Sequence, residues 1–277
     1  MINLLFAGNY KVYDALFLTL MSITKHSNRA LNVHVLTADV TELNPDYRPL
    51  DENHRKSLEE YIQKANKDSK VTLIHLGKDF NEWMLDSKNK LNSYTPFAFL
   101  RLFADKVDLP DKILYLDTDI MFNGDISELY DINVEEYELG VVLDRYGRFF
   151  ISPRYFNSGM LLMNMKNVKE SNLLEKVRIR CATKKMKFPD QSALNKHCKR
   201  KLYLPRRFNE QGNPRKDTIV QHFSKRIIWF PFHTINIKQN HIDKVQNVYK
   251  IHNYDDIYEE FLTIKSNSDI DKPITLW

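Results

Sequence analysis

Two carboxylates separated by one residue form the clearest chemical feature of the sequence. Asp117 and Asp119 follow the wholly apolar run 113–116, which is typical of a central parallel strand covered on both faces. Open α/β sheets bind ligands at the carboxyl ends of such strands. If the backbone bends there, both carboxylates can face one site, and their oxygens suit hard cations such as Mn²⁺ or Mg²⁺. We predict a divalent metal site here; the alternative is a solvated turn.

A metal held in this way has a definite use in nucleotide-sugar chemistry. It can bridge two phosphates and neutralise the charge that builds on a leaving diphosphate. The chain has only 7 glycines, and neither GxGxxG nor GxxxxGK[ST] occurs, so dinucleotide-binding and P-loop folds lack their signature. The pattern therefore favours a metal-dependent transferase.

Alternating apolar runs and amphipathic segments must position these carboxylates. We expect strands at 3–8, 32–38, 71–76, 113–116, 139–144, 155–165, 201–205 and 219–223, and helices at 12–25, 53–67, 97–107, 167–186 and 191–198. The β-α-β-α-β order at the start predicts an α/β fold with a parallel sheet covered by helices. Without a clean linker, we assign one domain, 1–240, and a C-terminal helical extension, 241–277.

Five blocks of sequence, in order, carry a family resemblance. They are LFAGNY (5–10), FLRLFA with ILYLDTD (99–104 and 113–119), YFNSGMLLMN (155–164), PDQSALN (189–195) and QHFS (221–224). Together they resemble glycosyltransferase family 8, which includes bacterial lipooligosaccharide galactosyltransferases and glycogenin.

This resemblance implies a single GT-A (Rossmann-like) domain with a mixed, mainly parallel sheet flanked by helices. It also implies a retaining enzyme that moves a hexosyl group, galactose or glucose, from a UDP-sugar donor. The acceptor would be a saccharide, a lipid-linked saccharide or a glycoprotein, as in polysaccharide biosynthesis. The cofactor would be Mn²⁺, with Mg²⁺ as the alternative.

Site residues follow from the matching motifs. The implied metal ligands are Asp117, Asp119 and His222; the implied catalytic residues are Gln191 and Asp190; and the implied donor-binding residues are Ala7, Asn9, Tyr10, Arg101, Thr118, Asn157, Ser158 and Lys238. Tyr10 would stack on the uracil. Gln191 would stabilise an oxocarbenium-like sugar, because an amide is a poor nucleophile.

Several assignments have alternatives in the sequence itself. Arg101 could instead form an i,i+4 pair with Asp105 on a solvated helix face, and Asp190 is also well placed as a helix N-cap. The family often has Asp where this chain has Gly8. The family's late Gly-x-Lys-Pro-Trp is absent, so Lys238 is the first candidate for the diphosphate lysine and Lys225 the second.

The net charge and composition limit the partners that the protein can have. The net charge of +5 could attract phosphorylated molecules, nucleic acid or anionic lipid. Because the sequence has no known nucleic-acid-binding motif, we do not expect the protein to bind nucleic acid. Basic stretches at 184–187 and 199–201 could contact a membrane surface. The N-terminus shows neither a signal-peptide pattern nor a membrane-spanning pattern, and the two cysteines do not have CxxC spacing. We therefore expect a cytoplasmic protein, which could also bind peripherally to the inner face of the membrane. Residues 144–154 and the divergent C-terminal third of the chain should shape the acceptor site.

Two other functions stay open at this level. A metal-dependent nucleotidyltransferase would also use paired carboxylates, although residues 8–12 offer only Lys11 for a triphosphate. A non-catalytic sugar-nucleotide-binding protein is the second. The sequence leaves the oligomeric state open.

Overall fold

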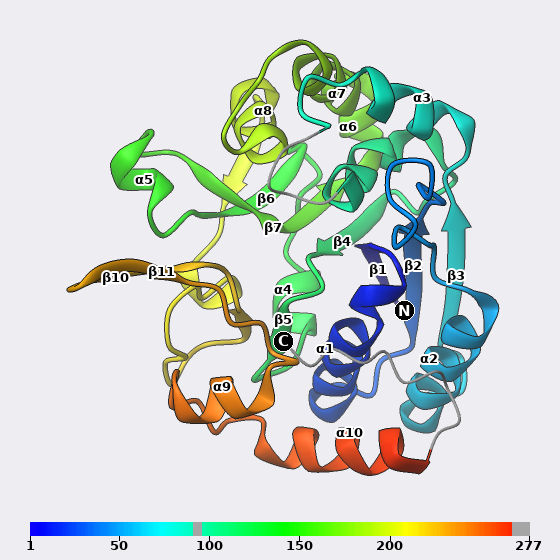
Figure 1. Cartoon of the computed structure of the whole chain (residues 1–277), viewed down its shortest axis with the longest axis vertical. Helices are drawn as coiled ribbons and strands as arrows, with labels where there is room; N and C mark the ends of the chain where they lie inside the picture. The colour runs from blue at the N-terminus through cyan, green and yellow to red at the C-terminus, as the bar shows by residue number, and fades with distance from the viewer. Residues whose placement is uncertain (91–95, 268–277) are drawn as a thin grey trace.

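A seven-stranded mixed sheet organises the chain, and a computed structural model describes residues 1–90 and 96–267 of it. The strand order is β3-β2-β1-β4-β7-β6-β8, shown in Figure 1. β7 runs antiparallel to β4 and β6, and the other neighbours are parallel. The expected mixed, mainly parallel sheet is confirmed. Its strands are β1 (Ile2–Ala7), β2 (Leu31–Thr37), β3 (Lys70–His75), β4 (Lys112–Leu116), β6 (Leu139–Leu143), β7 (Phe156–Asn164) and β8 (Lys201–Tyr203).

Helices cover both faces of the sheet (Figure 1). One face carries α1 (Tyr13–His26), α2 (Glu52–Ala65), α9 (Ile242–Asn247) and α10 (Asp255–Asn267). The other carries α3 (Lys78–Asp86), a 3₁₀ segment η2 (Pro96–Lys106), α6 (Met165–Glu170), α7 (Leu173–Thr183) and α8 (Pro189–His197). The described chain also has two short helices, α4 (Ser127–Tyr130) and α5 (Gly147–Phe150), and two 3₁₀ turns, η1 (Tyr10–Val12) and η3 (Arg206–Phe208).

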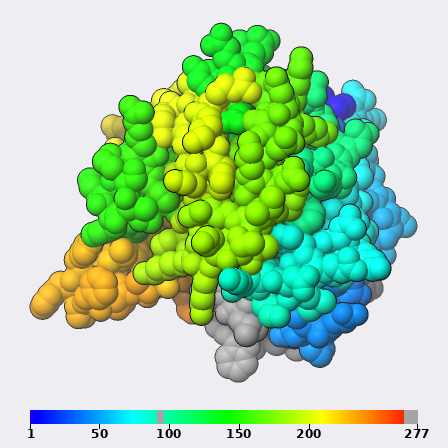
Figure 2. Space-filling model, turned by 90° about the horizontal axis from the view of Figure 1, so that it is seen from above, coloured from blue at the N-terminus to red at the C-terminus, as the bar shows by residue number. Residues whose placement is uncertain are grey.

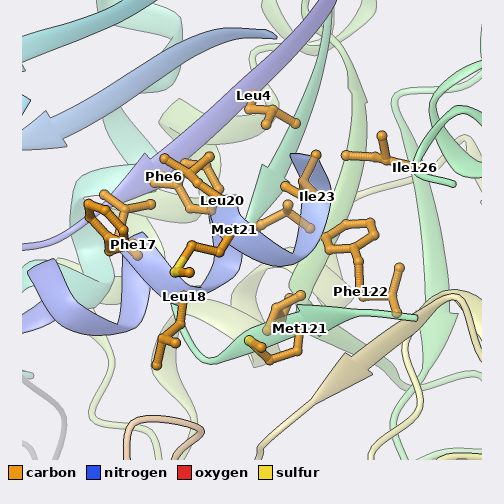
Figure 3. Close-up of a cluster of buried hydrophobic side chains, with 14 of the residues drawn as sticks. Leu4, Phe6, Phe17, Leu18, Leu20, Met21, Ile23, Met121, Phe122 and Ile126 are labelled. Atoms are coloured by element: carbon orange, nitrogen blue, oxygen red, sulfur yellow. The ribbon is translucent and has the colours of Figure 1, made fainter. Parts of the chain in front are cut away.

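Period-two alternation along the strands builds two separate cores. In β1, Leu4 and Phe6 join the core under α1, whereas Leu5 joins the core under η2, because successive side chains of a strand point to opposite faces. Figure 3 shows Leu4 and Phe6 near Leu20 and Met21 of α1. The site is thus built on a strand system that is anchored from both sides.

A second, two-stranded ladder brings the late part of the chain to the metal-site motif. β5 (Ile120–Phe122) pairs antiparallel with β9 (Val220–His222), and Ile120 lies opposite His222. β5 begins directly after Asp119, so this pairing sets the histidine beside that carboxylate. A strand around β9 was expected from the sequence, whereas β5 was not.

Some expected elements differ from those observed. The helix expected at 167–186 is two helices, α6 and α7, because Asn172 adopts a left-handed conformation (φ 52) that interrupts the helix. The helical segment expected at 97–107 is wound as 3₁₀ turns. α3 and the hairpin β10 (Arg226–Trp229) with β11 (Phe232–Ile235) were not predicted.

The C-terminal helices pack on the main body. Phe261 of α10 lies 6.0 Å, centroid to centroid, from Phe17 of α1, and Tyr254, Tyr258 and Phe261 belong to the core under α1. The boundary drawn at residue 240 stays a prediction, and residues 268–277 of the expected extension lie outside the described residues. None of the helices described in residues 1–90 and 96–267 is both long and apolar enough to cross a bilayer.

Candidate active site

Asp117 sits where β4 ends and is held by three partners. Its N–H donates to the carbonyl of Gly159 at 2.7 Å. Its Oδ1 accepts a hydrogen bond from the Tyr115 hydroxyl at 2.7 Å and lies 3.0 Å from Nη1 of Arg101. The side chain remains 28% exposed. The carboxylate is thus fixed in direction and still open to a ligand.

Asp119 turns toward the same point because the backbone bends at residues 118 and 119. Its Oδ1 lies 3.2 Å from Nε2 of His222, and its Oδ2 pairs with Nζ of Lys238. Burial alone would raise the pKa of Asp119, but the charge of Lys238 and the contact with His222 outweigh it and lower that pKa. Asp119 is therefore ionised at neutral pH, as a metal ligand must be.

The three expected metal ligands come together. Ligand atoms of Asp117, Asp119 and His222 all lie within 4.8 Å of one another. Two carboxylates and one imidazole suit Mn²⁺, a cation that accepts both oxygen and nitrogen ligands. This donor set fits the metal that the resemblance implies.

A relay of amide side chains fixes the ring of His222. The Asp144 carboxylate can only accept hydrogen bonds, and its Oδ2 accepts one from Nδ2 of Asn157 at 3.0 Å. This turns Oδ1 of Asn157 toward Nδ2 of Asn209 at 3.0 Å, and Oδ1 of Asn209 then faces Nδ1 of His222 at 3.0 Å. An amide oxygen accepts, so Nδ1 carries a proton, and Nε2, 3.2 Å from Oδ1 of Asp119, is the nitrogen left for a metal in the Nδ1–H tautomer. A histidine held in this tautomer is ready to bind a metal through Nε2.

Gly159 makes room for this cluster. A Cβ at that position would lie 2.3 Å from Cε1 of His222 and 2.8 Å from Oδ2 of Asp117. Both distances are far below van der Waals contact, so any side chain at residue 159 would displace the metal-site residues. The glycine is needed for space rather than for an unusual backbone conformation.

Arg101 links Asp117 to the first turn of α8. It is buried, its Nη1 donates to the carbonyl of Ser158 at 2.7 Å, and its Nη2 lies 3.2 Å from Oδ2 of Asp190. Burial would lower the pKa of Arg101, but the neighbouring carboxylates raise it. The guanidinium therefore holds two candidate site carboxylates in one arrangement.

Two alternatives from the sequence are wrong. Arg101 does not pair with Asp105 on a solvated face, because Asp105 pairs with Arg178. Asp190 is not an N-cap, because α8 begins at Pro189, the cap position is Phe188, and no side chain caps the helix. Asp190 lies inside the first turn, and its carboxylate turns inward to Arg101.

Gln191 is oriented by its neighbours. Its Oε1 accepts from the N–H of Ser158 at 3.1 Å, and its Nε2 donates to Oδ2 of Asp144 at 3.3 Å. The Ser158 hydroxyl also lies 3.3 Å from Oε1. Asn157, Ser158, Asp190 and Gln191 thus form one hydrogen-bonded group that adjoins the carboxylate cluster through Arg101.

Most of the other residues predicted to bind the sugar-nucleotide donor lie at the ends of β1 and β4. Leu5 pairs with Tyr115, so two residues later Ala7 is level with Asp117. Buried Asn9 and half-buried Tyr10 follow on the same edge, and the guanidinium of Arg48 lies 4.7 Å from the Tyr10 ring centroid. The carbonyl of Thr118 accepts from the hydroxyl of Thr19 at 3.2 Å and from the amide of Gln239. No described contact joins Tyr10 directly to the carboxylate cluster.

The two candidate lysines differ clearly. Lys238 pairs with Asp119 and lies at the cluster, whereas Lys225 is exposed. Lys11, the one basic residue that could have served a triphosphate near β1, pairs with Asp46 at 2.8 Å. The geometry therefore favours Lys238 over Lys225.

Several residues that complete this arrangement were not predicted from the sequence. Asp144 directly follows β6, so the rule that drew attention to Asp117 could have found it. Asn209 lies in a loop 13 residues before His222 in the chain, and nothing local marks it. Tyr115 reads in the sequence only as part of an apolar strand.

The sequence is similar to those of known glycosyltransferases. Residues 2–230 match the model described as glycosyl transferase family 8. Glycosyltransferase GlyF of Streptococcus pneumoniae serotype 4 is 28% identical over 180 residues, 64% of this chain and 40% of that protein. The lipopolysaccharide 1,2-glucosyltransferase of Escherichia coli K12 is 32% identical over 126 residues, 40% of this chain and 37% of that protein. The chain thus spans about 40% or less of the length of these curated relatives.

Solved structures share the fold. GlyE of Streptococcus pneumoniae TIGR4 superposes with a TM-score of 0.66 at 18% identity, covering 96% of this chain and 65% of that one. The galactosyltransferase LgtC, in complex with donor and acceptor sugar analogs, superposes with a TM-score of 0.64 at 18% identity, covering 80% and 86%. The expected GT-A-like α/β fold is therefore confirmed.

Proposed function

Because the chain belongs to glycosyl transferase family 8, we propose that it is a retaining glycosyltransferase that moves a hexosyl group, galactose or glucose, from a UDP-sugar to a saccharide or glycoconjugate acceptor. The observation that carries the proposal is the convergence of Asp117, Asp119 and His222 beside the Arg101–Asp190–Gln191 group. One group suits a divalent metal and a diphosphate, and the other suits the hydroxyls of a sugar.

The metal site is proposed for Mn²⁺, with Mg²⁺ as the alternative. Asp117, Asp119 and Nε2 of His222 would hold the ion, which when bound would neutralise negative charge on the diphosphate. Lys238, on the opposite oxygen of Asp119 from His222, is the proposed diphosphate lysine. Its ammonium group would stabilise the negative charge that develops on the diphosphate as the bond to the sugar breaks.

The donor sugar is proposed to lie against residues 157–158 and 190–191. Asp190, fixed by Arg101, would accept hydrogen bonds from sugar hydroxyls. Gln191 has its amide direction set by Asp144 and Ser158, so its dipole would lie beside the anomeric carbon and stabilise positive charge there. The acceptor hydroxyl would enter from the side on which the diphosphate leaves, and a phosphate oxygen would take its proton.

The base of the nucleotide is proposed to stack on Tyr10, near Ala7, Asn9 and Thr118. The level position of Ala7 and Asp117 supports this, because a UDP that reaches from base to diphosphate can follow the joined edges of β1 and β4. With Gly8 in place of an acidic side chain, backbone groups of β1 would contact the uracil edge.

Peripheral contact with the inner face of the membrane is also proposed, in a cytoplasmic protein. Aromatic side chains at α5 and the β10–β11 hairpin support it: Phe149, Phe150, Trp229, Phe230 and Phe232 are 62–94% exposed, and both segments project from one side of the molecule (Figure 1). Trp and Phe are residues that favour the headgroup level of a bilayer.

The test of the reaction is UDP release from a panel of UDP-sugars, with Mn²⁺ and with chelator. We expect slow hydrolysis of one donor without acceptor, abolished by chelator and by Asp119→Ala. Calorimetry of UDP with Mn²⁺ runs in parallel. If neither UDP nor any UDP-sugar binds the folded protein in the presence of Mn²⁺, the proposal is refuted.

A further inference from the structure

A strongly basic cavity lies beside the proposed sugar site. Its volume is about 850 Å³, and it opens between α8, β8 and the segment that leads into β7. Figure 2 views the molecule from above, where the green α5 segment adjoins the yellow atoms around β8. Five cationic side chains line the cavity: Arg154, Arg180, Lys196, Lys199 and Lys201. No acidic side chain of the described chain lines it.

The protein balances these charges only in part: buried Glu138 accepts a hydrogen bond from the backbone N–H of Lys199 at 2.7 Å. Within the described ranges, none of the five forms an ion pair, whereas neighbouring Arg200 lies 3.9 Å from Glu170. Nε of Arg180 is buried and has no hydrogen-bond partner. Lys201 is half-buried, with its Nζ 3.3 Å from the carbonyl of Asn195. Half-buried cations that are only partly balanced are unfavourable for the protein alone, and an anionic ligand would relieve this.

Nearby titratable groups respond to the same positive field. Burial lowers the pKa of His197, and Arg180 and the surrounding lysines lower it further. Burial likewise lowers the pKa of Lys201; Cys198 and Glu138 oppose this shift, whereas Lys199 and Arg154 add to it. The cavity therefore has a positive potential that extends beyond single side chains.

The cavity adjoins the catalytic group without including the metal cluster. Ser192 lines it and directly follows Gln191. The Ser192 hydroxyl lies 2.8 Å from that of Tyr155, which also lines the cavity. Asp117, Asp119, His222 and Lys238 are not among its lining residues. An anion bound here is thus distinct from the donor diphosphate, and its carrier can reach Gln191.

We infer that this cavity binds a phosphate or carboxylate group carried by the acceptor, so that the acceptor of this enzyme is an anionic saccharide. The inference rests on the proposed function, since it names the acceptor class for the same active site. The charge selects the acceptor and brings its reactive hydroxyl toward the anomeric carbon, which is proposed to lie beside Gln191.

The experiment compares three probes on the full chain saturated with UDP and Mn²⁺: methyl glucoside, its 6-phosphate and methyl glucuronide. We expect at least one anionic probe to bind roughly tenfold or more tightly than the neutral one, because a hydrogen bond to a charged group contributes about that much. The preference should shrink as salt is raised. Lys196→Gln with Lys199→Gln removes two exposed charges, and Lys201→Gln removes a half-buried one.

A matched control removes two exposed charges elsewhere, Lys56→Gln with Lys67→Gln, and should keep the preference. Equal binding of all three probes, or a preference that survives both cavity variants, would overturn the inference. So would loss of binding to phosphatidylglycerol vesicles in the cavity variants without any change in probe affinity, since the cations would then serve a bilayer. Failure of the proposed function is separate, because it appears as absent UDP binding before any probe is added.

Discussion

Replacing Asn209 with leucine tests the tautomer relay behind the metal site. Asn209 is fully buried and joins Asn157 to His222 through two hydrogen bonds of 3.0 Å. In Asn209→Leu, Nδ1 of His222 loses its acceptor, and the tautomer with the proton on Nε2 gains weight because that atom faces Asp119 at 3.2 Å. The proton then occupies the atom that should bind the metal.

The expected loss follows from the role of such an outer hydrogen bond. Removing the partner that orients a histidine ligand lowers metal affinity about 10–100-fold, which corresponds to about 1.4–2.8 kcal/mol. The leucine also leaves a buried donor unsatisfied, at about 1–3 kcal/mol of folding stability. Affinity for Mn²⁺ is measured by calorimetry or by the electron paramagnetic resonance signal of free Mn²⁺, and folding by thermal denaturation.

Asn89→Leu serves as the matched control. Asn89 is also buried, and its amide donates to the carbonyl of Lys184 at 2.7 Å, away from the site. The control should lose stability to a similar degree and keep the parent's Mn²⁺ affinity. If folded Asn209→Leu binds Mn²⁺ as tightly as the parent, the relay does not set the state of His222.

Three further perturbations address separate features. Gly159→Ala puts a methyl group 2.3 Å from the His222 ring, so it should destabilise the fold by about 1–3 kcal/mol and abolish Mn²⁺ binding in calorimetry. Gln191→Ala should lower kcat roughly 100-fold while the affinity for UDP-sugar changes little, as steady-state kinetics can resolve. His34 is buried with both ring nitrogens unpartnered, and burial, then Lys70, lowers its pKa below 6.5. The unfolded chain takes up this proton first, so stability should fall as pH drops below about 6.5, by up to about 1.4 kcal/mol per pH unit, and denaturant titrations of His34→Leu should show a weaker fall.

Each of these has a control and a contrary result. Gly77→Ala adds a methyl group with nothing within 4 Å and should bind Mn²⁺ normally; normal binding by Gly159→Ala as well would remove the spatial role of that glycine. Unchanged kcat in Gln191→Ala would exclude the amide from catalysis. Parallel pH profiles for the parent and His34→Leu would mean that the buried ring does not control acid stability.

Local sequence was sufficient for the strands of the seven-stranded sheet and for the carboxylate motif. The apolar run before Asp117 identified β4 because a strand covered on both faces excludes polar side chains. The missed β5 has only three residues, Ile120–Phe122, and it exists because β9 pairs with it. The single helix expected at 167–186 failed because the left-handed turn at Asn172 has no strong local signature.

The sequence by itself determined which residues could form a site: Asp117, Asp119, His222, Asp190 and Gln191 were all named from motifs. Tertiary structure alone decided their partners. Arg101 forms ion pairs with Asp117 and Asp190 rather than with Asp105. Asn209, which is distant in sequence from Asp144, orients His222. Side-chain hydrogen bonds depend on direction and on distances of about 3 Å, and these are fixed only when strands from different parts of the chain are packed together.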